Sequence, residues 1–158
     1  MDNIAEIVKA VKKAGARRVL IQIPAGLKMK AAAIADAIEK NDVETIISAS
    51  PTYGACDLAD KEAKQMDCDL LVHIGHSKFY VDFKTEVPVI YYPWRYELNP
   101  NCDFSSIREK RIGLVTTINH MDVLVNVSEM LKNSGKEPVI GGQILGCWFA
   151  NATKIEDM

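Results

Sequence analysis

Arg18-Val-Leu-Ile-Gln-Ile23 is a short, mostly apolar segment that lies between two segments of helical pattern. Before it, isoleucine and valine recur at helical spacing from Asn3 to Ala14, and Gly15 follows where a glycine commonly ends a helix. After it, Pro24-Ala-Gly26 breaks the strand, and the alanine-rich segment from Met29 to Lys40 favours a helix. A continuously apolar strand between helices is typical of a parallel sheet that is buried on both faces.

The same alternation continues along the chain. Strands are predicted at Glu44 to Ser48, Asp69 to Ile74 and Val87 to Tyr92, and a helix at Asp57 to Met66. Pro88 has no backbone N–H, which favours the start of a strand or the edge of a sheet for the last of these strands. The predicted fold class is therefore α/β, with helices covering a parallel sheet.

The chain then begins a second copy of this pattern. The segment from Pro93 to Ser106 loses periodicity and carries two prolines, so we predict a linker at residues 94–106. Arg111-Ile-Gly-Leu-Val-Thr116 resembles the first strand at an offset of 93 residues, and a helical segment follows it from Met121 to Asn133. We predict a first α/β domain over residues 1–93 and a second over residues 107–158.

The second copy is predicted to be truncated. In the first copy a buried strand follows the helix after Cys56, whereas in the second the helical segment after Cys147 continues to Met158. The last strands of the first copy therefore have no counterpart in the second. Because a sheet of two strands buries little apolar area to offset chain entropy, we expect this chain to be a fragment of a larger protein.

Two cysteines occupy equivalent corners of the two copies. Cys56 lies in Ser48-Ala-Ser-Pro-Thr-Tyr-Gly-Ala-Cys-Asp57, after a strand and before a predicted helix, and Cys147 ends a strand and glycine turn that begin at Pro138. Ligands bind at the carboxyl edge of a parallel sheet, and the N-terminus of a following helix favours the thiolate that binds metals. The alternative is a small apolar core residue at each turn.

Core packing gives no reason for cysteine to recur at both corners, so we favour a metal site formed by Cys56 and Cys147. We expect both cysteines to face a cleft between the two units, because each follows an equivalent strand at its carboxyl edge.

The remaining cysteines and histidines have weaker signals. Cys68 precedes a buried strand and is predicted to be a core residue, while Cys102 lies in the linker and is predicted to be exposed. His73 alternates into its strand and is predicted to be a core residue with satisfied hydrogen bonds. Two interpretations of His76 are open: contact with a ligand at the carboxyl edge, or a loop histidine bonded to backbone.

Composition excludes several classes of function. The chain has 158 residues, of which 25% are charged and 48% hydrophobic, as in a soluble globular protein. A net charge of -2 without any basic run gives no footprint for nucleic acid. The acidic, amphipathic N-terminus is unlike a signal peptide, and nothing approaches a membrane span, so we expect a cytoplasmic protein. The four cysteines are then unsuited to a disulfide framework.

Five short motifs stand in order along the chain: Ile23-Pro-Ala-Gly-Leu27, Tyr53-Gly-Ala-Cys-Asp57, Gly75-His-Ser77, Leu114-Val-Thr-Thr-Ile118 and Gly142-Gln-Ile-Leu-Gly-Cys147. Together they resemble the archaeal Dph2 family of diphthamide biosynthesis enzymes. The resemblance implies a homodimer whose subunits contain three similar α/β domains, each giving one cysteine to a 4Fe-4S cluster. Cys56 and Cys147 match the first two of these cysteines, and the third would lie in a domain that this chain lacks.

The resemblance also implies an activity. It is that of a noncanonical radical enzyme, which transfers a 3-amino-3-carboxypropyl group from S-adenosylmethionine to a histidine of translation elongation factor 2. With only two of the three thiolates, this chain alone is expected to hold no stable cluster and to be inactive. We expect further cofactor-binding positions at Gly26, Tyr53, Gly54, His76, Gln143 and Gly146.

Two other interpretations stay open at this point. The chain could be a non-enzymatic doubly wound module that binds a small molecule or a partner, with both cysteines structural. It could also hold zinc through Cys56, Cys147 and a histidine, because zinc favours tetrahedral nitrogen and sulfur ligation. No G-x-G-x-x-G, P-loop or G-x-S-x-G motif is present to support dinucleotide, nucleotide or hydrolase chemistry.

Overall fold

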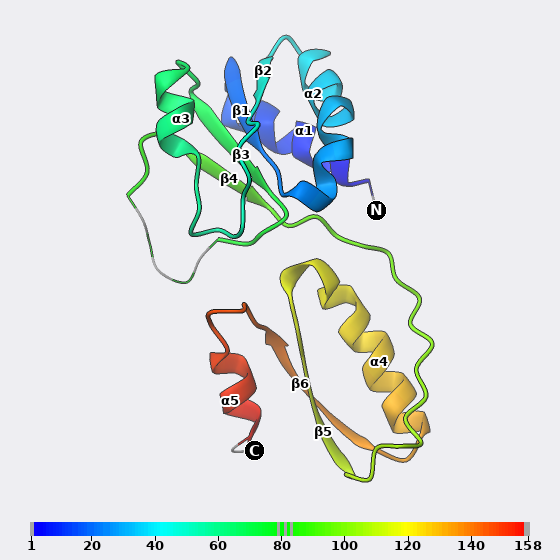
Figure 1. Cartoon of the computed structure of the whole chain (residues 1–158). Coiled ribbons are helices and arrows are strands. Elements are labelled where there is room, and N and C mark those ends of the chain that lie inside the picture. The colour runs from blue at the N-terminus through cyan, green and yellow to red at the C-terminus, as the bar shows by residue number, and fades with distance from the viewer. Residues whose placement is uncertain (1, 79, 81, 83, 157–158) are drawn as a thin grey trace. The chain divides into compact units, whose positions relative to one another are not determined.

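The computed structural model describes residues 2–78, 80, 82 and 84–156. Its contacts divide the chain into two units, Met1–Trp94 and Arg95–Met158 (Figure 1). In the described part of the chain, no helix is long and apolar enough to cross a membrane.

The first unit is built on four parallel strands. In chain order its elements are α1 (Asn3–Ala14), β1 (Arg18–Gln22), the 3-10 helix η1 (Ala25–Lys30), α2 (Ala31–Glu39), β2 (Glu44–Ile47), α3 (Asp60–Gln65), β3 (Leu70–Ile74) and β4 (Val89–Tyr92). The strand order is β2-β1-β3-β4, and every neighbouring pair is parallel. The predicted α/β fold with a parallel sheet is confirmed.

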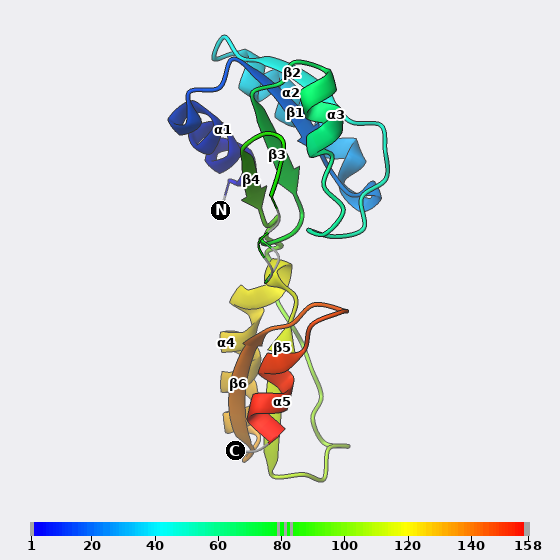
Figure 2. The same ribbon diagram turned by 90° about the vertical axis from the view of Figure 1, so that its left-hand side faces the viewer.

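Helices cover both faces of this sheet, as Figures 1 and 2 show for α1 and α2 on one side and α3 on the other. Successive side chains of a strand point to opposite faces, so Val19 and Ile21 of β1 join the core formed with α1 and α2. Leu20 joins the smaller core that includes Ala63 of α3 and Leu71 of β3. Continuously apolar strands are thus explained by burial on both faces.

Gly75 directly follows β3 and has a backbone conformation that is strained for any residue with a side chain. Its φ is +97°, its N–H donates to the Tyr92 carbonyl at 2.8 Å, and a Cβ there would lie 2.9 Å from Pro24 Cγ. The positive φ and the close approach of Pro24 both disfavour a side chain at position 75.

We expect Gly75→Ala to lower the free energy of unfolding by about 2 kcal/mol, because alanine pays both the strained φ and the contact with Pro24. Chemical denaturation of the two proteins measures this. The matched variant is Gly26→Ala, since a Cβ on Gly26 would meet nothing within 4 Å. A loss as large for Gly26→Ala as for Gly75→Ala would contradict the explanation.

The second unit is built on two parallel strands. Its elements are β5 (Arg111–Thr116), the 3-10 helix η2 (Ile118–His120), α4 (Met121–Asn133), β6 (Glu137–Gln143) and α5 (Ala150–Glu156). Figure 2 shows α4 and α5 on opposite sides of the strands. A Cβ on Gly113 would lie 2.6 Å from Ile155 Cδ1, and one on Gly141 would lie 2.9 Å from it. The absence of side chains at these two positions therefore lets α5 lie close to the sheet.

The second unit repeats the start of the first. In both, a strand is followed by a 3-10 turn, a helix and a parallel strand, and the register Arg18↔Glu44 recurs as Arg111↔Glu137. The N–H of Glu44 donates to the carbonyl of the residue before β1 at 2.8 Å, and the N–H of Glu137 donates to the residue before β5 at 2.7 Å. The predicted repeat of a parallel α/β unit is confirmed, and residues 94–106, the predicted linker, contain neither helix nor strand.

Candidate metal centre

Cys56 is the third residue of a tight turn in the loop between β2 and α3. The N–H of Asp57 donates to the Gly54 carbonyl at 3.0 Å, which closes the four-residue turn Gly54–Asp57. The Asp57 carboxylate accepts a hydrogen bond from the N–H of Tyr53 at 3.2 Å and so supports the same turn. The Cys56 thiol is exposed, and it lines a hollow of about 370 Å³ with Leu58, Asp60, Lys61 and Thr85.

The end of this loop is fastened to the sheet by a buried glutamine. Gln22 lies at the end of β1 and is 2% exposed. Its Nε2 donates to the Asp57 carbonyl at 2.7 Å, and its Oε1 accepts from the N–H of Ala59 at 3.1 Å. Because a buried amide is costly to leave unpaired, these two bonds hold the residues after Cys56 against the carboxyl end of β1.

The predicted helix start at Asp57 is wrong, and α3 begins at Asp60. The Asp57 carbonyl accepts from Gln22 and from the Thr52 hydroxyl, so Asp57 belongs to the loop and not to the first helical turn. Cys56 therefore precedes even the N-cap residue, Ala59. The effect of a helix terminus falls off within one turn, so the expected bias of Cys56 toward thiolate by this helix is not supported.

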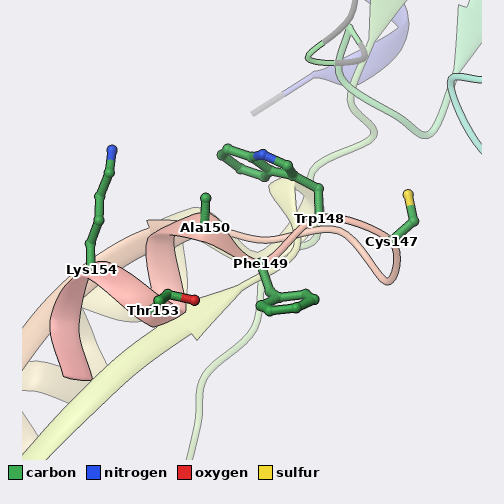
Figure 3. Close-up of a pocket in the computed structure, with 6 residues that line it drawn as sticks. All are labelled: Cys147, Trp148, Phe149, Ala150, Thr153 and Lys154. Atoms are coloured by element: carbon green, nitrogen blue, oxygen red, sulfur yellow. The ribbon is translucent and has the colours of Figure 1, made fainter. Parts of the chain in front are cut away.

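Cys147 is also the third residue of a tight turn that follows a parallel strand. The N–H of Trp148 donates to the Leu145 carbonyl at 3.1 Å, and the N–H of Leu145 donates back to the Trp148 carbonyl at 2.7 Å. The thiol is exposed, and α5 begins beyond it at Ala150. Figure 3 shows the hollow of about 450 Å³ beside this turn, with the rings of Trp148 and Phe149 on opposite sides of the chain. Its lining residues are Cys147, Trp148, Phe149, Ala150, Thr153 and Lys154.

The two thiols are therefore presented in the same way, each at the third position of a hydrogen-bonded turn beyond the carboxyl end of an equivalent strand. The repeat in the sequence predicted this correspondence. The turn itself was not predicted, because Gly54-Ala-Cys-Asp57 and Leu145-Gly-Cys-Trp148 share only the position of their cysteine.

The other predicted positions of the first unit lie near the carboxyl edge of its sheet. Tyr53 is 85% exposed and immediately precedes the Cys56 turn. A Cβ on Gly54 would lie 3.7 Å from the Cys56 sulfur, so Gly54 leaves the thiol open on that side. Gly26 lies in η1, the 3-10 helix that follows β1. Tyr53 and Gly54 are brought together with Cys56 by the turn itself.

In the second unit, Gln143 and Gly146 lie on the approach to Cys147. Gln143 is the last residue of β6, and its carbonyl accepts from Asn151 Nδ2 at 2.7 Å, which links the end of the strand to α5. Gly146 is the second residue of the Cys147 turn, where a Cβ would meet nothing within 4 Å. Their role as cofactor contacts stays a prediction.

His76 is bonded to a side chain. Its Nδ1 lies 3.0 Å from His73 Nε2, whereas the open alternative in the sequence was a bond to backbone. Burial lowers the pKa of His76, and the nearby Asp57 carboxylate opposes this in part. His73 is 0% exposed with both ring nitrogens bonded, as predicted for a satisfied core histidine. Burial lowers the pKa of His73 to about 4.

We expect the protein to lose stability as the pH falls from the ordinary histidine value toward 4. The His73 ring is neutral when folded, so below about pH 6.5 the unfolded chain binds a proton that the native state does not. The neutral His73 ring makes its full contribution to the free energy of unfolding above about pH 6.5, and this contribution is lost as the pH falls to about 4. The total loss is at most about 3 kcal/mol. Denaturant titrations across the range measure it. A wild-type stability that does not change with pH would contradict the assignment.

The two remaining cysteines lie where the sequence predicted them. Cys68 is 4% exposed and packs with Leu20, Leu71 and Val87, and burial raises the pKa of its thiol. Cys102 is exposed. Neither shares the turn that presents Cys56 and Cys147.

Each unit offers an exposed cysteine thiol as a soft metal ligand. Among the residues that the structure describes, no group of three histidine, cysteine or acidic side chains could hold a metal ion. Each unit instead offers one exposed thiol on a supported turn. Thiolates are the usual ligands of iron–sulfur clusters, so Cys56 and Cys147 are each suited by chemistry and exposure to ligate such a cluster.

Comparison with known proteins identifies the family. The family described as "Putative diphthamide synthesis protein" matches residues 23–158. This chain belongs to that family. The resemblance found in the sequence motifs is thereby confirmed.

Several relatives in the diphthamide synthesis family are similar over most of this chain. The 2-(3-amino-3-carboxypropyl)histidine synthase of Pyrococcus horikoshii is 37% identical, and the match covers 94% of this chain and 47% of that protein. Subunit 1 of the synthase from Gallus gallus is 31% identical, with 92% and 39% covered. The chain thus spans about half the length of the archaeal relative.

Solved structures of the same family share the fold. The crystal structure of Dph2 from Pyrococcus horikoshii matches with a TM-score of 0.82 at 36% identity, covering 94% of this chain and 48% of that one. The structure of Dph2 from the same organism with a 4Fe-4S cluster matches with a TM-score of 0.75 at 35% identity and the same coverage.

Proposed function

We propose that this chain forms part of a 2-(3-amino-3-carboxypropyl)histidine synthase, which catalyses the first step of diphthamide biosynthesis. The observation that carries the proposal is the pair of equivalent turns that present Cys56 and Cys147. Membership of the diphthamide synthesis family and the cluster in a related structure support it. In this reaction a 3-amino-3-carboxypropyl group passes from S-adenosylmethionine to a histidine of translation elongation factor 2.

Cys56 and Cys147 would each hold one iron of a 4Fe-4S cluster, with the third thiolate supplied by sequence outside this chain. When bound, the cluster supplies the electron that cleaves S-adenosylmethionine. The protein's part is to fix the thiols: Gln22 fastens the loop after Cys56, and the paired bonds of Leu145 and Trp148 close the Cys147 turn. We further propose that both thiols face one cleft.

The proposed function also assigns substrate contacts to residues around the two thiols and a dimeric state to the protein. Gly26, Gly54 and Gly146 leave open space in which a substrate can approach backbone, since a Cβ at Gly26 or Gly146 would meet nothing within 4 Å. Tyr53, His76 and Gln143 are the proposed side-chain contacts to S-adenosylmethionine. We propose a homodimer that works in the cytoplasm without nucleic acid or membrane.

The test is modification of the acceptor. We expect the full-length protein, reduced and supplied with S-adenosylmethionine, to add one 3-amino-3-carboxypropyl group to elongation factor 2, measured by intact mass. The control is elongation factor 2 with the acceptor histidine replaced, which should gain no mass. A full-length protein that holds its cluster and binds S-adenosylmethionine but never modifies the factor would overturn the proposal.

A further inference from the structure

A chain of hydrogen bonds runs from the Cys56 loop through the sheet to His76. Gln22 of β1 and His73 of β3 are partners in the parallel register, and both are buried. Gln22 Oε1 lies 2.7 Å from His73 Nδ1, and His73 Nε2 lies 3.0 Å from His76 Nδ1. Since Gln22 also binds Asp57 and Ala59, one residue connects the Cys56 loop with both histidines.

The orientation of the Gln22 amide is fixed because one of its partners can only accept a hydrogen bond and another can only donate one. The Asp57 carbonyl can only accept, so the amide nitrogen must lie beside it. The N–H of Ala59 can only donate, so the amide oxygen must lie on that side. The oxygen therefore faces His73, and the amide cannot be reversed without breaking both bonds.

The fixed amide determines the tautomer of each histidine in turn. Gln22 Oε1 carries no hydrogen, so His73 Nδ1 must donate to it. Burial keeps the His73 ring neutral, which leaves His73 Nε2 as an acceptor. His76 Nδ1 must then donate to His73 Nε2, and in a neutral ring the lone pair lies on His76 Nε2.

His76 Nε2 is available to a ligand. Among the described residues no buried side-chain nitrogen or oxygen lacks a partner, and the bond to His73 engages the opposite ring nitrogen of His76. No other hydrogen bond of His76 is found in the described part of the chain. Its Nε2 therefore reaches solvent and is left as an unoccupied acceptor at the carboxyl edge of the sheet.

We propose that Gln22 and His73 are positioning residues that hold His76 as the Nδ1–H tautomer, so that its Nε2 accepts a hydrogen bond from S-adenosylmethionine. This inference rests on the proposed function. The donor is an N–H or O–H group of the substrate, either the ammonium of its amino-acid part or a hydroxyl or amino group of its nucleoside.

The tautomers are the first test, because they require no substrate. Nitrogen-15 spectra of full-length protein with labelled histidine distinguish protonated from unprotonated ring nitrogens. We expect a protonated Nδ1 and an unprotonated Nε2 in both His73 and His76. The opposite tautomer in either residue would overturn the inference, whatever the enzyme's activity.

Binding of S-adenosylmethionine to the full-length holoprotein is the second test. We expect His76→Phe to weaken binding about tenfold through loss of the acceptor, whereas His76→Gln should restore most of the affinity through its side-chain oxygen. The matched variant His120→Phe should bind as the wild type does. If His76→Phe weakens the binding of 5′-methylthioadenosine as much as that of S-adenosylmethionine, the hydrogen-bond donor is on the nucleoside. If it weakens the binding of S-adenosylmethionine alone, the donor is the ammonium group.

The positioning role is tested by Gln22→Met, which keeps the length of the side chain and removes its polar atoms. We expect His76 Nε2 to become partly protonated and the affinity for S-adenosylmethionine, measured per bound cluster, to fall severalfold; the comparison is made per cluster because the same substitution also releases the loop after Cys56. A folded variant with wild-type tautomers and affinity would overturn the role, and if the variant does not fold, the wild-type spectra decide. Wild-type protein that binds no S-adenosylmethionine would overturn the proposed function, whereas binding unaffected by His76→Phe would overturn this inference alone.

Discussion

Replacement of Cys56 or Cys147 by alanine in the full-length protein is expected to remove most of the broad charge-transfer absorbance that anaerobic reconstitution with iron and sulfide produces. Each unit offers one exposed thiol on a supported turn, and among the described residues no group of three potential ligands could hold a metal ion without it. A cluster that loses one of three thiolates keeps too few protein ligands to remain bound. Visible spectra and iron content measure the loss.

Two other cysteines provide matched controls for this experiment. Cys102→Ala removes an exposed thiol and Cys68→Ala a buried one, and both variants should keep the absorbance. Equal loss from Cys68→Ala would show that the ligands are wrongly assigned. Colourless wild-type protein containing zinc would favour the zinc site instead, and colourless protein without metal would favour a binding module with structural cysteines.

The full-length protein with reductant should release 5′-methylthioadenosine from S-adenosylmethionine as its main nucleoside product. The expectation follows from the proposed function, in which the methionine side chain and not the adenosyl carbon is transferred. Substrate orientation decides which bond breaks, so in the proposed reaction the residues that contact S-adenosylmethionine would determine the product. Chromatography of the nucleosides measures it.

The outcome that would reject this mechanism is equally simple to observe. Release of 5′-deoxyadenosine and methionine as the main products would mean that the adenosyl carbon is the site of cleavage. Cys56→Ala is the control, because nucleoside that it still releases cannot come from a cluster held by that thiol. Absence of turnover by the 158-residue chain alone would not bear on the question, since only two of its four cysteines are proposed ligands and the proposed cluster needs three.

The sheet was predictable because its strands carry a strong local signal. Residues 19–21 and 70–72 are continuous apolar runs, and a strand that is buried on both faces favours such a run. The start of α3 was not predictable, since residues 57–59 have helical composition but are held in the loop by Gln22. Gln22 and Asp57 are far apart in the sequence, so no local sequence pattern predicts the hydrogen bond between them.

The candidate site also has one part that the sequence predicts and another that only the structure shows. The two cysteines could be found because the repeat brings them to equivalent positions, which is a property of the sequence. The bond between Gln22 and His73 depends on the register of β1 and β3, and a polar residue in an apolar strand is the one hint of it that the sequence contains. A polar residue in such a strand, paired with a histidine in the next, is therefore a signal to examine for a buried network.

The contact between Ile155 and the glycines of β5 and β6 sets a limit on how the second unit can vary. A side chain at Gly141 would meet the Asn151 carbonyl of α5 at 3.0 Å and Val115 at 2.9 Å, so it would push the helix away from the strands, whereas at Gly113 it would meet only the end of the Ile155 side chain. The Cys147 turn is the short connection between β6 and α5, so a displaced helix would carry the thiol with it. A substitution at Gly141, which is no ligand itself, is thus expected to impair cluster assembly while leaving both cysteines in place.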